Sequence, residues 1–552
     1  MILTSQEAIS KFEGMGIWGN KTIIDYFKEH VEKKPDQICI IDPPNKKALM
    51  GLDPERLTYS EFDKAVDATA EGLAKLGIGK DDIIMVQMPN CWELAMMYLA
   101  IARAGALTSP APVLWRKAEL SHIAKLTEAK AFITVNEFNN FNHKQLGEEL
   151  MSENSSMEHV LVVNDIKKMA QNDVKGSLSD IQISANDIFT ICWTSGTEAA
   201  PKGCPLSHNN WMGMVAVQKA GGMQAGDVML TAGPLVNMAS IGTVYMPWLN
   251  LGGTMVLHHP FDPAVFMQQM IQEKVNYTLL VPAVTNMIAK HPNVDSFDLS
   301  SVRAITVGSA PSSLWTMQEF NRRWGISIGN IWGQNEGTGI VSGIEDVPEM
   351  KTRVDHFPQF GKPGAKWKSN ASKLIIAKVI DPATGEELTK TGDVGELVYK
   401  GPGVIAEYFK NPEATKKSFT EDGFFKTGDQ FQIKDGDYIA FFDRGKDIII
   451  RGGFNISAQE IENYLLSHPK VQDAAAIAMK DERLGEKMCV YICPIPGEKV
   501  ELSDITSLLE EKGVAKYKYP ERLEIIDMIP RNPVGKILKN KLRDDINEKL
   551  EE

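Results

Sequence analysis

The stretch "DIFTICWTSGTEAAPKG", residues 187–203, joins an apolar run to a loop of small and hydroxyl-bearing residues. Its first part, 187–193, has the β-branched and aromatic content of a buried strand. The second part, 194–203, combines threonine, serine and glycine with one lysine. Small residues let backbone N–H groups approach an anion closely, and a lysine adds a positive charge. The stretch therefore predicts a strand that leads into a phosphate-binding loop.

Similar apolar runs recur on both sides of this stretch and alternate with helical patterns. Residues 57–77 predict a strand end followed by an amphipathic helix, capped at Ser60 and ending at Gly77. Residues 82–90 then predict a buried strand, and residues 91–105 a buried helix. Because the alternation continues to about residue 310, it predicts an α/β fold with mainly parallel central strands.

The pattern changes after about residue 361. Short apolar runs separated by polar turns predict a small antiparallel unit there. Beyond residues 441–447 a compact α+β segment follows, with a helix over 457–469 and a strand over 487–495. We therefore predict one domain over residues 1–443 and a second over residues 444–552.

Composition and charge exclude several classes of protein. The chain has 552 residues, more than one core usually holds, and 43% of them are apolar. A net charge of −13 offers no basic excess for nucleic acid. The sequence has neither an apolar run of membrane-spanning length nor a secretory signal pattern. Because the six scattered cysteines form no CxxC, we expect reduced core residues and a cytoplasmic protein.

One apparent motif is set aside. Residues 14–19, "GMGIWG", match the glycine spacing of a dinucleotide-binding loop. The preceding segment is polar and helix-like, whereas that loop must follow a strand. The loop at 194–203 also lacks the Walker pattern of a P-loop ATPase. Neither a dinucleotide site nor a P-loop fold is predicted.

Six motifs together resemble the adenylate-forming acyl-CoA synthetase family, in order and spacing, over nearly the whole chain. The resemblance is strongest to ligases of aryl and alicyclic acids and to free-standing aryl-acid adenylating enzymes. It implies a large N-terminal domain of two mixed, mainly parallel sheet subdomains plus the antiparallel barrel-like unit, followed by a small mobile α+β C-terminal domain. The motifs are "TSGTEAAPKG" (194–203), "WGQNEG" (332–337), "GELVYKGPGVIAEYFKNPEAT" (395–415), "DGFFKTGD" (422–429), "DRGKDIIIRGGFNISAQEIE" (443–462) and "PRNPVGK" (530–536).

The family resemblance implies a reaction in two steps. A carboxylate attacks the α-phosphate of ATP, giving acyl-AMP and pyrophosphate, and a thiol then takes the acyl group. Charge that develops on phosphate is neutralised by a metal and fixed donors rather than by a nucleophilic side chain. We therefore expect Mg²⁺ as the cofactor and ATP, a carboxylic acid and CoA as the small-molecule partners. A homodimer is left open.

The phosphate-binding loop would hold the β- and γ-phosphates of ATP through its backbone and hydroxyls, with Lys202 balancing their charge. The loop departs from the common family pattern at Glu198 and Ala199, where Thr and Gly are usual. An acid there repels phosphate unless it points outward or joins the metal shell, and Ala199 removes one permissive backbone position. The loop residues predicted to bind ATP are Thr194, Ser195, Gly196, Thr197 and Lys202.

Other family positions complete the predicted ATP site. Glu336 is similar to the family's magnesium ligand, with Thr197 as a second metal contact. Trp332 replaces the aromatic residue that stacks on adenine, and Asn335 replaces a threonine near the α-phosphate. Asp429 would accept both ribose hydroxyls, with Arg444 beside it. The remaining residues that we expect around the nucleotide are Gly308, Ser309 and Gly333.

The family resemblance also assigns roles in the two reaction steps to residues of the second domain. By resemblance, Lys536 bridges the carboxylate and the α-phosphate during adenylation. Lys446 occupies the hinge about which the small domain would turn between the two steps. Gly452 and Gly453, with Phe454, would then line the CoA channel, although a glycine pair in a plain hairpin turn would look the same.

The predicted acyl pocket comprises Asn237, Met238, Ala239, Val307 and Gln334. Aryl-acid enzymes often carry His-Asn where Asn237 and Met238 stand, so a partner for an ortho-hydroxyl is missing. The apolar residues favour a pocket for a cyclic (aryl or alicyclic), benzoate-like or cyclohexanecarboxylate-like acid, or for a medium-length acid.

The sequence leaves four function classes open. The leading one is an AMP-forming acid–CoA ligase, and the main alternative is an adenylation enzyme that loads a carrier protein. An oxygenase of the luciferase kind shares these motifs. A non-catalytic relative is disfavoured because the predicted charged residues are all present, namely Lys202, Glu336, Asp429 and Lys536.

Overall fold

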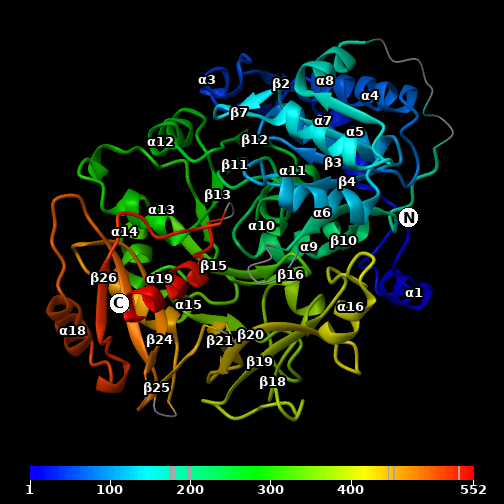
Figure 1. The fold of residues 1–552 in the computed structure, drawn as a ribbon. Helices are drawn as coiled ribbons and strands as arrows, with labels where there is room; N and C mark the ends of the chain where they lie inside the picture. The colour runs from blue at the N-terminus through cyan, green and yellow to red at the C-terminus, as the bar shows by residue number, and fades with distance from the viewer. Residues whose placement is uncertain are drawn as a thin grey trace.

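The fold is taken from a computed structural model of the whole chain (Figure 1). The structure describes residues 1–172, 178, 181–194, 201–309, 311–444, 447–451, 454–481, 483–532 and 535–551. Among these residues, none of the helices is both long and apolar enough to cross a lipid bilayer. We call residues up to 444 the N-terminal region and residues from 447 onward the C-terminal region.

The stretch at 187–203 contributes to the first of two mainly parallel sheets, which has six strands. Its order is β10 (Gly203–Ser207), β9 (Ile188–Trp193), β4 (Leu107–Pro110), β3 (Ile83–Gln87), β5 (Ala131–Thr134) and β8 (His159–Val162). The strands are parallel except for β10, which turns back on β9. The helices of this part are α4 (Tyr59–Lys75), α5 (Trp92–Arg103), α6 (Lys117–Thr127), α7 (His143–Glu153) and α8 (Val163–Ala170).

The second sheet has eight strands and is antiparallel only at its two edges. Its order is β16 (Gly337–Ser342), β15 (Ser327–Gln334), β14 (Ala304–Val307), β13 (Tyr277–Leu280), β11 (Val228–Thr231), β12 (Thr254–Leu257), β1 (Ile38–Ile41) and β2 (Arg56–Thr58). The helices between these strands include α9 (His208–Lys219), α10 (Met238–Ser240), α11 (Met246–Leu251), α12 (Pro263–Gln272), α13 (Pro282–Ala289) and α14 (Leu314–Trp324). Smaller helices of the N-terminal region are α1 (Gln6–Gly14), α2 (Ile23–Lys33), α3 (Lys46–Met50), α15 (Met350–Arg353) and α16 (Pro412–Ser418).

An antiparallel five-stranded sheet curls into a half-barrel against these layers (Figure 1). Its order is β17 (His356–Pro358), β21 (Tyr438–Arg444), β20 (Phe425–Ile433), β19 (Val394–Lys400) and β18 (Ile376–Ile380). The predicted fold class, mainly parallel sheets plus a small antiparallel barrel-like unit, is therefore confirmed.

The C-terminal region has a sheet of its own, with helices on both faces. Alternation along β24 decides the two faces, because Ala474 packs toward α17 and α18 while Ile477 packs toward α19. The strands are β22 (Ile449–Arg451), β23 (Phe454–Ile456), β24 (Val471–Asp481), β25 (Gly485–Pro494) and β26 (Arg522–Ile525). The helices are α17 (Ala458–Leu466), α18 (Leu502–Glu511) and α19 (Lys539–Glu551).

The start of α4 differs from the sequence prediction. The cap is Thr58 and not Ser60, since the Thr58 hydroxyl accepts from the backbone N–H of Glu61. The Glu61 carboxylate in turn accepts from the backbone N–H of Thr58, which completes a capping box. Gly77 follows the helix with a φ of 79°, a conformation that glycine adopts without strain.

Two buried features bear on stability and reactivity. Lys46 is fully buried and pairs with Asp42 at 2.7 Å and with Glu93 at 2.8 Å, both of which are buried too.

All six cysteines are free and buried. Burial raises the pKa of the thiols, for example that of Cys192 to about 12, so they remain protonated near neutrality.

Candidate active site

The loop predicted to bind phosphate is closed at its base by two hydrogen bonds. The backbone N–H of Thr194 donates to the carbonyl oxygen of Lys202 over 3.0 Å. The backbone N–H of Lys202 donates to the Thr194 hydroxyl, also over 3.0 Å. The predicted contacts Ser195, Gly196 and Thr197, with the unusual Glu198 and Ala199, lie outside the described residues.

Lys202 and Glu336 are brought together by Tyr408. The ammonium of Lys202 lies 4.1 Å from the centre of the Tyr408 ring, an attractive cation–π distance. The hydroxyl of the same tyrosine donates to Oε1 of Glu336 over 2.7 Å. One aromatic side chain therefore connects the predicted phosphate ligand to the predicted metal ligand.

Glu336 lies half-buried in the wall of a cavity. Its removal from bulk water raises the pKa of the carboxyl group, and the negative charge of Asp429 acts in the same direction. The hydrogen bond from Tyr408 and the charge of Lys202 lower the pKa and so favour the ionised form.

A magnesium ion would have one protein carboxylate here rather than a complete cage. The described residues include no group of three or more His, Cys, Asp or Glu side chains that could hold a metal. Mg²⁺ commonly takes one or two carboxylates and completes its octahedron with water and substrate phosphates. Glu336 fits such a shared site, and the second predicted contact, Thr197, lies outside the described residues.

Asp429 lies on β20 at another part of the same wall. Its Oδ2 accepts from the indole N–H of Trp332 over 2.7 Å, and the amide of Gln334 donates to the same atom over 3.4 Å. Arg444 is the cross-strand neighbour of Asp429 on β21, and its side chain lies outside the described part. The orientation of Asp429 is therefore fixed by neighbouring side chains, and its contact with ribose stays a prediction.

Two predicted side chains point differently from the expectation. The Trp332 ring packs edge-on between Tyr399 and Phe431 in the half-barrel core, and does not form part of the cavity wall. In this structure Trp332 therefore positions Asp429 and is not placed to stack on adenine. Gln334, expected in the acyl pocket, directs its amide to the carbonyl oxygen of Thr427 at 2.8 Å, on the Asp429 side.

Asn335 connects two segments of the site through its amide. Its Nδ2 donates to the carbonyl oxygen of Trp193 over 2.7 Å, and its Oδ1 accepts from the backbone N–H of Met238 over 2.9 Å. It therefore ties the end of β9 to the start of α10. The amide nitrogen and the amide oxygen of Asn335 therefore both bind protein backbone, and neither is free for the α-phosphate.

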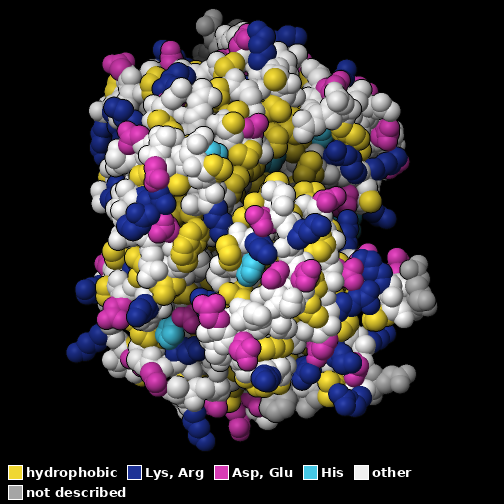
Figure 2. Space-filling model, turned by 90° about the vertical axis from the view of Figure 1, so that its left-hand side faces the viewer, with side chains coloured by type: hydrophobic (Ala, Val, Ile, Leu, Met, Phe, Trp, Pro, Cys, Tyr) yellow, Lys and Arg dark blue, Asp and Glu magenta, His cyan; other side chains and the backbone are white. Residues whose placement is uncertain are grey.

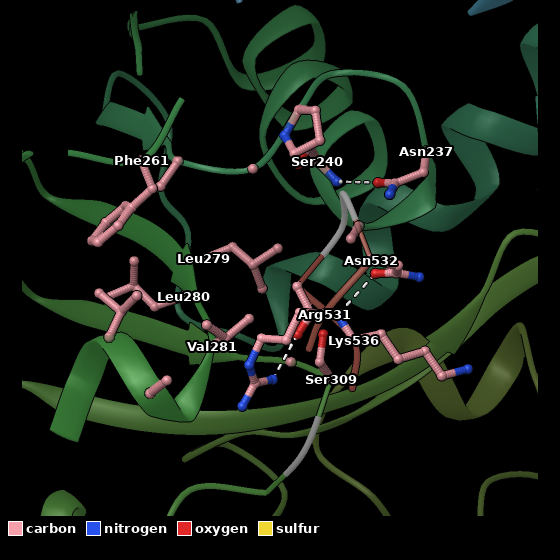
Figure 3. A pocket seen from close by; sticks show the side chains of 18 of the residues that line it. Asn237, Ser240, Phe261, Leu279, Leu280, Val281, Ser309, Arg531, Asn532 and Lys536 are labelled. Atoms are coloured by element: carbon pink, nitrogen blue, oxygen red, sulfur yellow. Dashed lines mark hydrogen bonds between the residues drawn. The ribbon is translucent and has the colours of Figure 1, made fainter. Parts of the chain in front are cut away.

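Most of the predicted acyl-pocket residues line the cavity. Asn237 caps α10 by accepting from the backbone N–H of Ser240 over 3.3 Å (Figure 3). Ala239 is exposed to the cavity. Val307 is an exception, since it is fully buried in the core behind β14 and points to the opposite face of the strand. Its neighbours Gly308 and Ser309, with Met238 and Gly333, do line the cavity.

Lys536 reaches the same cavity from the C-terminal region (Figure 3). Its backbone N–H donates to Oδ1 of Asn532 over 2.9 Å, and the backbone N–H of Asn532 returns a bond to its carbonyl oxygen over 2.8 Å. Arg531 donates to the carbonyl oxygen of Gly535 over 2.7 Å and pairs with Asp473 over 2.8 Å. The loop that carries Lys536 is therefore braced from both sides.

The cavity has a volume of about 1220 Å³ and is formed by both regions of the chain. On the face seen in Figure 2, hydrophobic side chains gather around a hollow. The large hydrophobic side chains that are exposed in the described part of this wall are Leu114, Phe261 and Met528. Thr194, Asn237, Glu336, Asp429 and Lys536 all share this one space.

Comparison with family models decides the family. The model of the AMP-binding enzyme matches residues 27–409, and that of the AMP-binding enzyme C-terminal domain matches residues 460–536. The chain belongs to the AMP-binding enzyme family. As the motifs predicted, this AMP-binding enzyme is an adenylate-forming ligase related to acyl-CoA synthetases and aryl-acid–AMP ligases.

Individual relatives resemble the enzyme over its whole length. A medium-chain fatty-acid–CoA ligase of Escherichia coli is 29% identical, covering 99% of this chain and 94% of the relative. A 2,3-dihydroxybenzoate–AMP ligase of Bacillus subtilis is 28% identical, covering 99% and 97%. The ATP-bound crystal structure of MatB from Rhodopseudomonas palustris shares the fold, with a TM-score of 0.80, 24% identity and coverage of 96% and 99%.

The predicted hinge and CoA channel are not located. Lys446, Gly452 and Gly453 lie outside the described residues, and Phe454 is described only as the backbone of β23. Strands β22 and β23 are antiparallel, with Arg451 opposite Phe454. The hinge, the channel and the division at residue 444 therefore stay predictions.

Several residues of the site were not found from sequence. Tyr408 lies inside a family motif, "GVIAEYFK", but nothing in the motif alone says that its hydroxyl faces Glu336. Asp473 and Arg531 brace the Lys536 loop although only Arg531 stands near it in sequence. Phe261 and the segment 279–284 form an apolar part of the cavity wall. Their sequence looks like that of ordinary core segments, so nothing in it indicated a place in the site.

Proposed function

We propose that this AMP-binding enzyme is an ATP-dependent, AMP-forming carboxylic acid–CoA ligase. The observation that carries the proposal is the single cavity shared by the predicted ATP, acyl and catalytic residues of both regions. A reaction that joins ATP to an acid needs these groups around one space, because proximity and fixed charge supply most of the catalysis.

In the first step, a carboxylate oxygen would attack the α-phosphorus of ATP, and the bond to the bridging oxygen of pyrophosphate would break. Lys536 would place its ammonium between the incoming carboxylate and the α-phosphate, while Asp429 would hold the ribose hydroxyls. Lys202 would balance the charge of the leaving diphosphate. In the second step a CoA thiol would attack the acyl carbon, and AMP would leave.

Mg²⁺ would be the cofactor, with Glu336 as the ligand that the described residues offer. Such an ion, when bound, neutralises phosphate charge. The chain's own part is to keep Glu336 ionised, to which the Tyr408 hydroxyl and the Lys202 charge both contribute.

The acid would be a hydrophobic one, either cyclic (aryl or alicyclic) or of medium length. The wall near α10 and β13 supports this, since it is built from apolar groups such as Leu279, Leu280 and Val281 (Figure 3). The E. coli relative is named for medium-chain fatty acids. The acid of the B. subtilis relative is a dihydroxybenzoate, and that name supports the second candidate, an adenylation enzyme that loads a carrier protein.

The test is to incubate the protein with ATP, Mg²⁺ and a panel of carboxylic acids, with and without CoA. AMP and pyrophosphate should form with the preferred acid, and a thioester should form when CoA is added. ADP as the main product would overturn the proposal. Formation of acyl-AMP without acceptance of CoA would favour the carrier-loading candidate.

A further inference from the structure

Lys290 of the N-terminal region contacts the C-terminal region. It follows α13 directly, and its side chain extends toward the end of α17. The ammonium donates to the carbonyl oxygens of Leu466 over 3.2 Å, His468 over 3.3 Å and Val471 over 3.2 Å. Residues of α13 and of β24 accordingly lie close to each other.

These bonds match the chemistry of an ammonium group. Lysine has three N–H donors and no acceptor, so three carbonyl oxygens satisfy it completely. Leu466 is the last residue of α17, where the helix dipole also favours a cation. Among the residues that the structure describes, no carboxylate lies within ion-pair distance of Lys290. Burial without such a partner lowers the pKa of its ammonium.

A continuous chain of contacts leads from Lys290 to the loop of Lys536. Val471, one of the three acceptors, opens β24, and Asp473 stands two residues farther along the same strand. Asp473 pairs with Arg531, which donates to the carbonyl oxygen of Gly535 beside Lys536. Fixing the start of β24 therefore fixes the brace of the catalytic loop.

The other end of α13 lies close to the same loop. A Cβ placed on Gly535 would lie 3.7 Å from Cγ1 of Val281, which immediately precedes α13. The helix has eight residues, so its two ends are about 12 Å apart. The hydrogen bonds of Lys290 at one end of the helix, with the close approach to the loop at its other end, resist tilting of the C-terminal region more than the hydrogen bonds alone.

We propose that Lys290 is a positioning residue that holds the C-terminal region in the orientation which presents Lys536 to the cavity. The inference rests on the proposed adenylation function. Its three hydrogen bonds must break before the C-terminal region can turn away for the second step. Lys290 thereby favours the first half-reaction over the second.

The kinetic test compares Lys290→Met with Lys416→Met. Methionine keeps an unbranched side chain and removes the three donors, whereas Lys416 is exposed on α16 and none of its described neighbours pairs with it. In Lys290→Met, acyl-AMP formation should fall about tenfold or more, because charged hydrogen bonds no longer bias the orientation. Thioester formation from supplied acyl-AMP should not fall, and Lys290→Arg should recover part of the loss. Equal loss in both half-reactions would mean a merely structural role and would overturn the proposal.

A second readout does not depend on activity. Because the native thiols are buried, cysteines placed at the exposed positions Ser300 and Lys512 can be spin-labelled selectively, one in each region. The distance distribution between the labels should broaden in Lys290→Met and stay unchanged in Lys416→Met. An unchanged distribution in Lys290→Met would overturn the proposal. If the wild type adenylates no acid, the proposed function fails, and the distance measurement still decides the role of Lys290.

Discussion

Replacing Tyr408 by phenylalanine removes one hydroxyl and leaves the ring beneath Lys202. The structure then predicts a specific change in how activity depends on pH. In the native enzyme the hydrogen bond from Tyr408 stabilises the ionised form of Glu336 and lowers its pKa. Removal of this carboxyl group from bulk water acts in the opposite direction and raises the pKa. Without the hydroxyl the pKa of Glu336 rises further, so the carboxylate that we propose as the Mg²⁺ ligand becomes protonated at a higher pH.

The size of the shift follows from the geometry. A hydrogen bond to a charged group contributes about 1.5–3 kcal/mol, and about 1.4 kcal/mol corresponds to one pKa unit. Glu336 is only half-buried, so water partly replaces the hydroxyl and the lower end of that range applies. We expect the acidic limb of kcat/KM to move up by about one pH unit. The Mg²⁺ concentration for half-maximal rate should rise at a fixed pH near that limb.

The assay is initial-rate AMP formation across pH at saturating ATP, repeated at several Mg²⁺ concentrations. Tyr399→Phe is the matched control, because its buried hydroxyl has no hydrogen-bond partner among the described residues. An acidic limb that stays in place in Tyr408→Phe, or moves equally in both variants, would refute the reasoning.

Three other changes test separate parts of the structure. Lys536→Ala should slow acyl-AMP formation by roughly 10²–10³-fold while thioester formation from supplied acyl-AMP persists, since one fixed charge is lost only from the first step; equal loss in both would contradict this. Ala239→Trp should shift the preference among acids toward smaller acids with an unchanged KM for ATP, because the Ala239 side chain faces the cavity. An unchanged preference would mean that the acyl group binds elsewhere. Lys46→Met should lower the free energy of unfolding in urea by about 3–5 kcal/mol, because the buried carboxylates of Asp42 and Glu93 would lose the ammonium that they share, and of the described cations only Lys167, 3.9 Å from Glu93, would remain nearby; a loss below about 1 kcal/mol would disagree.

Sequence alone could predict the strand, loop and helix order, because apolar periodicity and small loop residues act locally. The capping box at Thr58 and Glu61 was also present in the sequence, and its T-x-x-E spacing marks the true start of α4 better than Ser60 does. The cavity residues on motifs, such as Glu336 and Asp429, could be assigned by position.

What could not be predicted is where a side chain points once strands pair. Trp332 turns into the half-barrel and Val307 into the core, because the sheet that β14 and β15 share fixes which face of each strand their side chains take. Lys290 is harder still to find. Its acceptors are backbone carbonyls 176 to 181 residues farther along the chain, and every residue has a carbonyl.

The burial of all six cysteines has a consequence for the enzyme's own safety. An acyl-adenylate is an acylating agent, and a protein thiolate beside it would be modified in competition with the intended acceptor. Cys192 and Cys204 lie on the two strands that flank the phosphate-binding loop, yet both are buried with raised pKa values. The charge of Glu336 raises the pKa of Cys204 further. In the proposed reaction these buried, protonated thiols would therefore not compete with the incoming thiol for the acyl group.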